Sequence, residues 1–307
     1  MAHPATVFAN AFDGAFRTAT ARLGAGEVEL FRAMEMALIG MGYPFAVEEY
    51  HGGSHQVLFA GNGSYARTAA RCELSDLMIL AFDPATRKAR LTYLQAKSER
   101  RPVGAACAMK FEANLEQWFL LSLRPVISGH GAFNPPSDLL SAAILNSVGS
   151  FAFFYKDASI GYQTFYASAS YLQLAGTYTQ KDGRLTAAGR CQVSTRRGYE
   201  ECDAACSNFD FAANLYRLKI GTPIDVTSGA PANIRKWIGA AIRTQLISAK
   251  VRDAGGQVAR RLLEIVDPDG TDESSGEFGA KTLIILEGKS DSDEPPINQA
   301  VPPKFQN

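Results

Sequence analysis

The strongest constraint on the fold is a pair of apolar segments, residues 77–82 and 89–96, joined by a short polar connection. The first segment, LMILAF, is an uninterrupted apolar run of the kind found in buried strands. The connection, DPATRK, contains Asp, Pro and Thr, which favour a turn. The second segment, ARLTYLQA, returns as another strand candidate. We therefore predict a β-hairpin.

Helices and further strands are expected on both sides of this hairpin. In residues 26–42, apolar side chains recur at the i, i+3/i+4 spacing of one helix face, as at Leu30, Met34 and Leu38. Similar reasoning predicts helices at 111–123, 208–218, 232–251 and 258–266, and strands at 56–60, 148–155 and 282–287. The chain is thus predicted to be an α/β protein, and 46% apolar against 20% charged residues suits a sizeable core.

Composition also bears on compartment. No segment approaches 18 consecutive apolar residues, so a membrane-spanning helix is not expected. The first residues lack the basic start and apolar run of a secretory signal. The five cysteines are odd in number and scattered, which predicts reduced thiols and a cytoplasmic protein.

Charge is distributed unevenly although 31 basic and 31 acidic residues cancel. Residues 264–294 hold ten acidic residues and two lysines, a net −8, so the rest of the chain carries +8. A positive body is compatible with a polyanionic partner, and also with an ordinary solvated surface. Basic residues are dense between 87 and 101, and the candidate nucleic-acid contacts there are Arg87, Lys88, Arg100 and Arg101.

The hairpin brings a candidate site together. Asp76 directly precedes the first strand, and Gln95 and Lys97 share one side of the second strand. Antiparallel pairing can bring that side back beside Asp76. A carboxylate, an amide oxygen and an adjacent ammonium suit a hard cation such as Mg²⁺, which takes oxygen ligands. In the ordinary structural alternative, Asp76 caps a strand while Gln95 and Lys97 face water.

Asp76, a gap of 18 residues across the hairpin, and the triplet Gln95-Ala96-Lys97 resemble the metal-binding signature of the PD-(D/E)xK nuclease superfamily. The QxK form is similar to that of Mrr-type restriction nucleases. The resemblance, which covers about residues 20–160, implies a restriction-endonuclease-like central mixed sheet flanked by helices, and we assign this nuclease-like core to residues 1–175. Residues 176–289 lie beyond the resemblance and are expected to form a C-terminal α+β extension that serves recognition, oligomerisation or regulation. Residues 290–307, with four prolines and almost no apolar run, are expected to be a disordered tail.

The superfamily also places a glutamate on a helix before the hairpin. Glu27, which the helix spacing assigns to the apolar face of residues 26–42, is the first candidate, followed by Glu29 and then Glu35. The resemblance then implies that Asp76, Gln95 and Glu27 bind Mg²⁺, with Mn²⁺ as a substitute, and that Lys97 acts on the attacking water. Two departures are Ser75 in place of proline and Gln95 in place of an acid. The second removes a negative charge, which predicts either weaker metal binding or a stronger reliance on Glu27 and the DNA phosphate.

The function implied is a cytoplasmic, metal-dependent DNA endonuclease of a bacterial restriction or antiviral defence system, acting as a homo-oligomer, with a dimer expected. Two alternatives stay open. One is a non-catalytic module on the same fold that binds nucleic acid or protein, which Gln95 favours. The other is a nuclease switched on by a small signalling ligand bound within residues 176–290.

Overall fold

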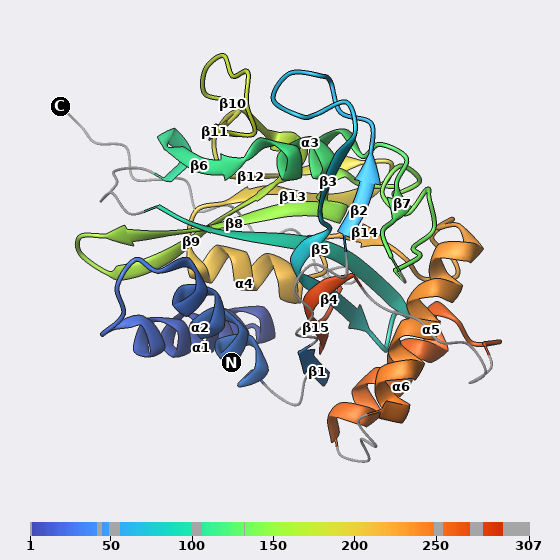
Figure 1. The fold of residues 1–307 in the computed structure, drawn as a ribbon. Helices are drawn as coiled ribbons and strands as arrows, with labels where there is room; N and C mark the ends of the chain where they lie inside the picture. The colour runs from blue at the N-terminus through green and yellow to red at the C-terminus, as the bar shows by residue number, and fades with distance from the viewer. Residues whose placement is uncertain are drawn as a thin grey trace.

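The structure is a computed structural model that describes residues 2–41, 45–48, 56–99, 106–131, 133–248, 254–270 and 279–290. It is a mixed α/β protein with one large mixed sheet between helices (Figure 1). From edge to edge the strands are β1 (Phe45–Glu48), β15 (Ala280–Glu287), β4 (Ser75–Asp83), β5 (Lys88–Ser98), β8 (Gly149–Asp157), β9 (Gly161–Ser168), β13 (Tyr199–Ala205) and β12 (Gln192–Arg196), with β14 (Thr222–Pro223) paired to β5.

The predicted hairpin is confirmed as β4 and β5, which pair antiparallel from Leu77 opposite Leu94 to Asp83 opposite Lys88. Each strand of the hairpin has a parallel neighbour on its outer side: β15 runs parallel to β4, and β8 runs parallel to β5. The strands β15, β13 and β12 come from the predicted C-terminal region, and they belong to the same sheet as the hairpin.

Both faces of the sheet are covered, which explains why residues 77–82 of β4 are all apolar. Leu77 and Ile79 face a core formed with α1 (Pro4–Thr20), α2 (Glu27–Ile39) and α4 (Asn208–Tyr216). Met78 and Leu80 face a second core on the opposite side, where α3 (Leu115–Leu123), α5 (Ala232–Ser248) and α6 (Ala254–Val266) pack (Figure 1).

Two small sheets complete the second side. Their strand orders are β10 (Leu172–Leu174), β11 (Asp182–Ala187), β6 (Lys110–Asn114) and β3 (Ala70–Glu73), β2 (Gln56–Phe59), β7 (Ser128–Gly129). Short 3₁₀ turns occur at η1 (Ala106–Ala108), η2 (Asn146–Val148) and η3 (Ala169–Tyr171). The first of these sheets matters for the site, because β6 and β11 form one wall of the cleft described below.

Four of the predicted helices are confirmed as α2, α4, α5 and α6, but the single helix predicted over residues 111–123 is wrong. The structure divides that segment into β6 and α3. Within β6, Phe111 and Ala113 are buried while their neighbours are exposed, the alternation of a strand. Asn114 ends the strand and caps the helix, because its side chain accepts hydrogen bonds from two backbone N–H groups of the first turn.

The helix α1 was not predicted, although Phe8, Phe12 and Phe16 recur every four residues and are buried. It packs against α2 and α4 on the first face (Figure 1). No helix in the described part of the chain is long and apolar enough to cross a membrane. Apart from Ser290, the predicted tail at 290–307 lies outside the described residues.

The prediction of reduced thiols is wrong for one pair of cysteines. Cys191 and Cys206 form a disulfide, with their Cα atoms 6.0 Å apart. Pairing of β12 with β13 places Gln192 opposite Ala204, which brings the two flanking cysteines together. Cys72, Cys107 and Cys202 carry no disulfide.

Candidate active site

Asp76 and Gln95 are in direct contact across the hairpin. The register, with Leu77 opposite Leu94, sets Asp76 opposite Gln95, and the Gln95 Nε2 donates to Asp76 Oδ2. The Ala96 backbone N–H donates to the same oxygen at 2.9 Å. The two residues are buried, with whole-residue exposures of 5% for Asp76 and 2% for Gln95. The ordinary structural alternative required Gln95 to face water, and in the structure it does not.

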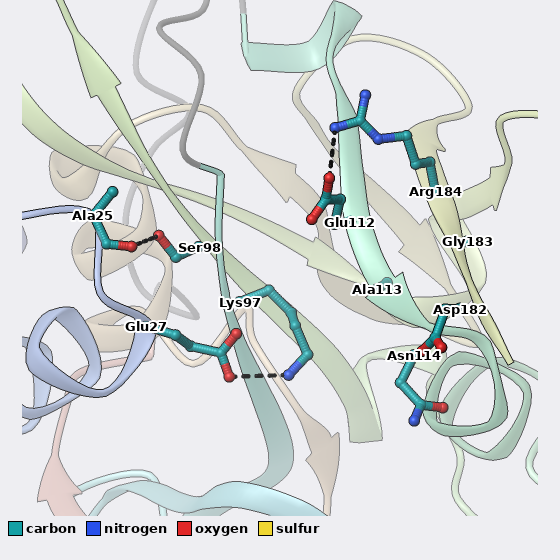
Figure 2. Close-up of a pocket in the computed structure, with 10 residues that line it drawn as sticks. All are labelled: Ala25, Glu27, Lys97, Ser98, Glu112, Ala113, Asn114, Asp182, Gly183 and Arg184. Carbon is teal, nitrogen blue, oxygen red and sulfur yellow. Dashed lines mark hydrogen bonds and ion pairs between the residues drawn. The ribbon is translucent and has the colours of Figure 1, made fainter.

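Lys97 and Glu27 form a second pair at the same end of the hairpin (Figure 2). Lys97 Nζ lies 3.1 Å from Glu27 Oε1, and the two side chains are 17% and 44% exposed. Glu27 is the first residue of α2, where the helix dipole favours a carboxylate. Glu27 has the helix spacing of the apolar face, but its side chain is exposed because the N-terminus of α2 is open to the cleft. The buried glutamate of α2 is Glu35, whose carboxylate contacts Thr282 of β15, while Glu29 is exposed.

Lys281 is a site residue that the sequence did not reveal. Its Nζ lies 2.6 Å from Asp76 Oδ1 and 3.2 Å from Glu73 Oε2. Burial disfavours its ammonium form, but the carboxylates of Asp76 and Glu73 outweigh burial, so the pKa of Lys281 is raised above its usual range. Its position just before the apolar run 282–287 was visible in the sequence, but the neighbouring strand was not.

Two hollows meet at Glu27. A small cavity of about 180 Å³ is lined by Glu27, Asp76 and Lys281 together with Phe31 and Thr282 of the flanking elements. A larger cleft of about 650 Å³ lies between the end of β5 and the wall formed by β6 and β11 (Figure 2). Its charged lining residues are Glu27, Glu112, Asp182, Lys97 and Arg184, so three carboxylates and two cations give it a formal charge of −1.

The donor chemistry fits Mg²⁺ in kind. Asp76 and Glu27 offer carboxylate oxygens, and Gln95 offers Oε1, which is buried and has no hydrogen-bond partner among the described residues. The fit has one condition. The described ranges contain no group of three or more His, Cys, Asp or Glu side chains suited to a metal. In addition, the Lys281 ammonium forms an ion pair with Asp76 Oδ1. A divalent ion can bind Asp76 Oδ1 only after that ammonium moves.

The predicted nucleic-acid contacts are not gathered at this site. Arg87 and Lys88 lie at the hairpin turn, and Lys88 is nine residues along β5 from Lys97, which corresponds to about 30 Å of strand. The Arg87 guanidinium donates to the carbonyl oxygen of Glu264, and Lys88 Nζ donates to Thr227 Oγ1. Arg100 and Arg101 lie outside the described residues.

Comparison with protein-family models found no match, and comparison with curated proteins and with solved structures found no significant match either.

Proposed function

We propose that this protein is a divalent-metal-dependent DNA endonuclease with a restriction-endonuclease-like fold of the PD-(D/E)xK type. The observation that carries the proposal is that α2, β4 and β5 bring four side chains to one end of a buried hairpin: Glu27, Asp76, Gln95 and Lys97. Asp76 contacts Gln95 across the hairpin, and Lys97 contacts Glu27 two residues further along β5. That arrangement is the one expected for the aspartate and QxK motif of this superfamily.

In this proposal Asp76, Gln95 and Glu27 hold Mg²⁺ or Mn²⁺, which when bound polarises the phosphodiester and lowers the pKa of a bound water. The Ala96 N–H holds Asp76 Oδ2 in place, so the carboxylate is oriented before any ligand arrives. Lys97 presents its ammonium at the wall of the larger cleft, where it orients the attacking water and offsets charge in the transition state.

The charge of the larger cleft supports metal dependence. With a formal charge of −1, its charged side chains repel a phosphodiester as they stand. One divalent cation next to Glu27 changes that charge to +1. DNA is therefore expected to enter the cleft only together with the ion. A role in restriction or defence and a dimeric assembly rest on analogy with the superfamily alone.

A second candidate function is a non-catalytic module that binds nucleic acid or protein on the same fold. Two observations favour it: Gln95 is neutral where the superfamily usually has an acid, and Lys281 already balances the charge of Asp76. A site paired in this way is stable without a metal.

The test is incubation of the purified full chain with plasmid DNA in Mg²⁺, Mn²⁺ or EDTA. We expect cleavage with either metal and none in EDTA. Lys97→Ala should reduce the cleavage rate about a hundredfold or more, the usual range for loss of a group that stabilises transition-state charge. Lys289→Ala, at an exposed lysine just after the end of β15 and outside the cleft lining, is the matched control and should cleave at the native rate.

Lys97→Ala should fold normally, because its partly exposed ion pair with Glu27 contributes about 1 kcal/mol or less. Cleavage by Lys97→Ala at the native rate would refute the catalytic assignment. Metal-independent DNA binding by a native chain that never cleaves would favour the non-catalytic module.

A further inference from the structure

Lys281 reaches the candidate site from a distant part of the chain. The strand β15 runs parallel to β4, with Ala280 opposite Ser75 and Thr282 opposite Leu77, so Lys281 lies beside Asp76. The two residues are 205 positions apart in sequence. On this face a single row of side chains therefore crosses three strands, from Lys281 through Asp76 to Gln95.

We infer that Lys281 is a built-in cation that occupies the Asp76 carboxylate in place of a divalent metal, and that metal binding displaces its ammonium toward Glu73. This inference rests on the proposed function, since it takes Asp76 as the metal ligand. By competing for Asp76, Lys281 controls how strongly the site binds a metal.

The need for such a cation follows from burial. The Asp76 side chain is 7% exposed, and a buried carboxylate without a compensating charge strongly destabilises a fold. The neutral amide of Gln95 supplies a hydrogen bond but no positive charge. Lys281 supplies that charge, so the metal-free chain holds its site together.

The ability of the ammonium to move follows from its surroundings. The Lys281 side chain is 51% exposed, and its four-carbon stem is flexible. Glu73, at 29% exposure, already lies 3.2 Å from the same Nζ. When a divalent ion takes Asp76, the ammonium keeps Glu73 as its partner. The lysine is therefore an exchangeable occupant of the site, unlike Ala96, whose N–H is fixed by the backbone.

Opposite effects on metal affinity are expected from the two partners of this exchange. Lys281→Met removes the competing charge and should tighten metal binding by about tenfold, the factor that corresponds to roughly 1.4 kcal/mol. Glu73→Gln removes the second partner of the ammonium, leaves Lys281 on Asp76, and should weaken metal binding severalfold. In the double variant Lys281→Met/Glu73→Gln, the effect of Glu73→Gln on metal affinity should be smaller, because there is no Lys281 ammonium for Glu73 to bind.

The experiment is a titration of the full chain with Mn²⁺ alone, with free Mn²⁺ measured by electron paramagnetic resonance. Lys289→Met, an exposed lysine just after β15, is the control for loss of a lysine and should leave the affinity unchanged. Asp76→Asn should abolish the site in every background. Thermal unfolding in EDTA checks that each variant is folded, and Glu73→Gln carries the test if Lys281→Met folds poorly.

Tighter Mn²⁺ binding by Lys281→Met together with weaker binding by Glu73→Gln supports the inference. Equal or weaker binding by a folded Lys281→Met overturns it, even if the native chain cleaves DNA and the proposed function stands. If only Lys281→Met binds Mn²⁺ and the native chain neither binds nor cleaves, Lys281 blocks the site and it is the proposed function that fails. Absence of binding in all variants overturns both.

Discussion

The substitution Gln95→Glu tests directly whether the Asp76 site is built for a cation. The Gln95 amide nitrogen donates to Asp76 Oδ2, and both side chains are buried. The substitution replaces that donor by a second carboxylate at the same place. The metal-free protein should therefore lose stability, whereas the metal-bound protein should gain the acidic ligand that most of the PD-(D/E)xK superfamily uses.

The size of the loss can be bounded in two ways. Two unit charges about 4 Å apart repel by about 4 kcal/mol at an effective dielectric constant near 20. Alternatively, the introduced carboxylate takes up a proton at pH 7. Protonating a glutamate at pH 7, when its ordinary pKa is near 4.3, costs about 3.7 kcal/mol. Because Lys281 relieves part of the repulsion on Asp76, we expect a loss of about 3–4 kcal/mol, or roughly 5–6 °C in Tm for a chain of 307 residues.

The assay is thermal unfolding in EDTA and in millimolar Mn²⁺ or Mg²⁺. Metal should raise the Tm of Gln95→Glu much more than that of the native chain, and metal-dependent cleavage should be kept or increased. Gln163→Glu is a matched control, because Gln163 is also 2% exposed but donates to the carbonyl of Tyr162 rather than to a carboxylate. It should be destabilised with no recovery in metal. A Gln95→Glu protein as stable as the native chain in EDTA, or not rescued by metal, would contradict the reasoning.

Further predictions concern stability, with the free energy of unfolding measured in urea. Tyr93→Phe should raise this free energy by about 1 kcal/mol, because the Tyr93 hydroxyl is buried without a hydrogen-bond partner among the described residues. Tyr166→Phe should lower it by about 1 kcal/mol, because the Tyr166 hydroxyl loses its 2.8 Å hydrogen bond to the Ser150 hydroxyl. Burial raises the pKa of the Cys72 thiol to about 12, so as the pH rises from 9 the unfolded chain loses this proton before the folded chain does. The free energy of unfolding should therefore fall by about 1.4 kcal/mol per pH unit between pH 9 and 12. Cys72→Ala should make the free energy of unfolding less dependent on pH, as measured by guanidinium unfolding at about pH 9–11. Reductant should lower Tm through loss of the Cys191–Cys206 bridge, which closes a loop of 15 residues and contributes about 3 kcal/mol, and Cys191→Ala should not respond to reductant.

Local patterns were sufficient for the central hairpin. An apolar run, turn residues and a returning strand lie within 22 residues of one another, between Asp76 and Lys97, and their pairing needs no information from elsewhere in the chain. The contact between Asp76 and Gln95 follows from that register. The segment at 111–123 shows where local patterns fail, because the strand β6 exists through pairing with β11, about seventy residues away.

What the sequence by itself determined is therefore the hairpin and the order of Asp76, Gln95 and Lys97 along it, since strand alternation and turn chemistry act between near neighbours. Only the tertiary structure decided what completes the site. Insertion of β15 beside β4 brings Lys281 onto Asp76, and the start of α2 brings Glu27 onto Lys97. Both contacts join residues far apart in the chain, so they depend on how the whole sheet and its covering helices bury their apolar faces.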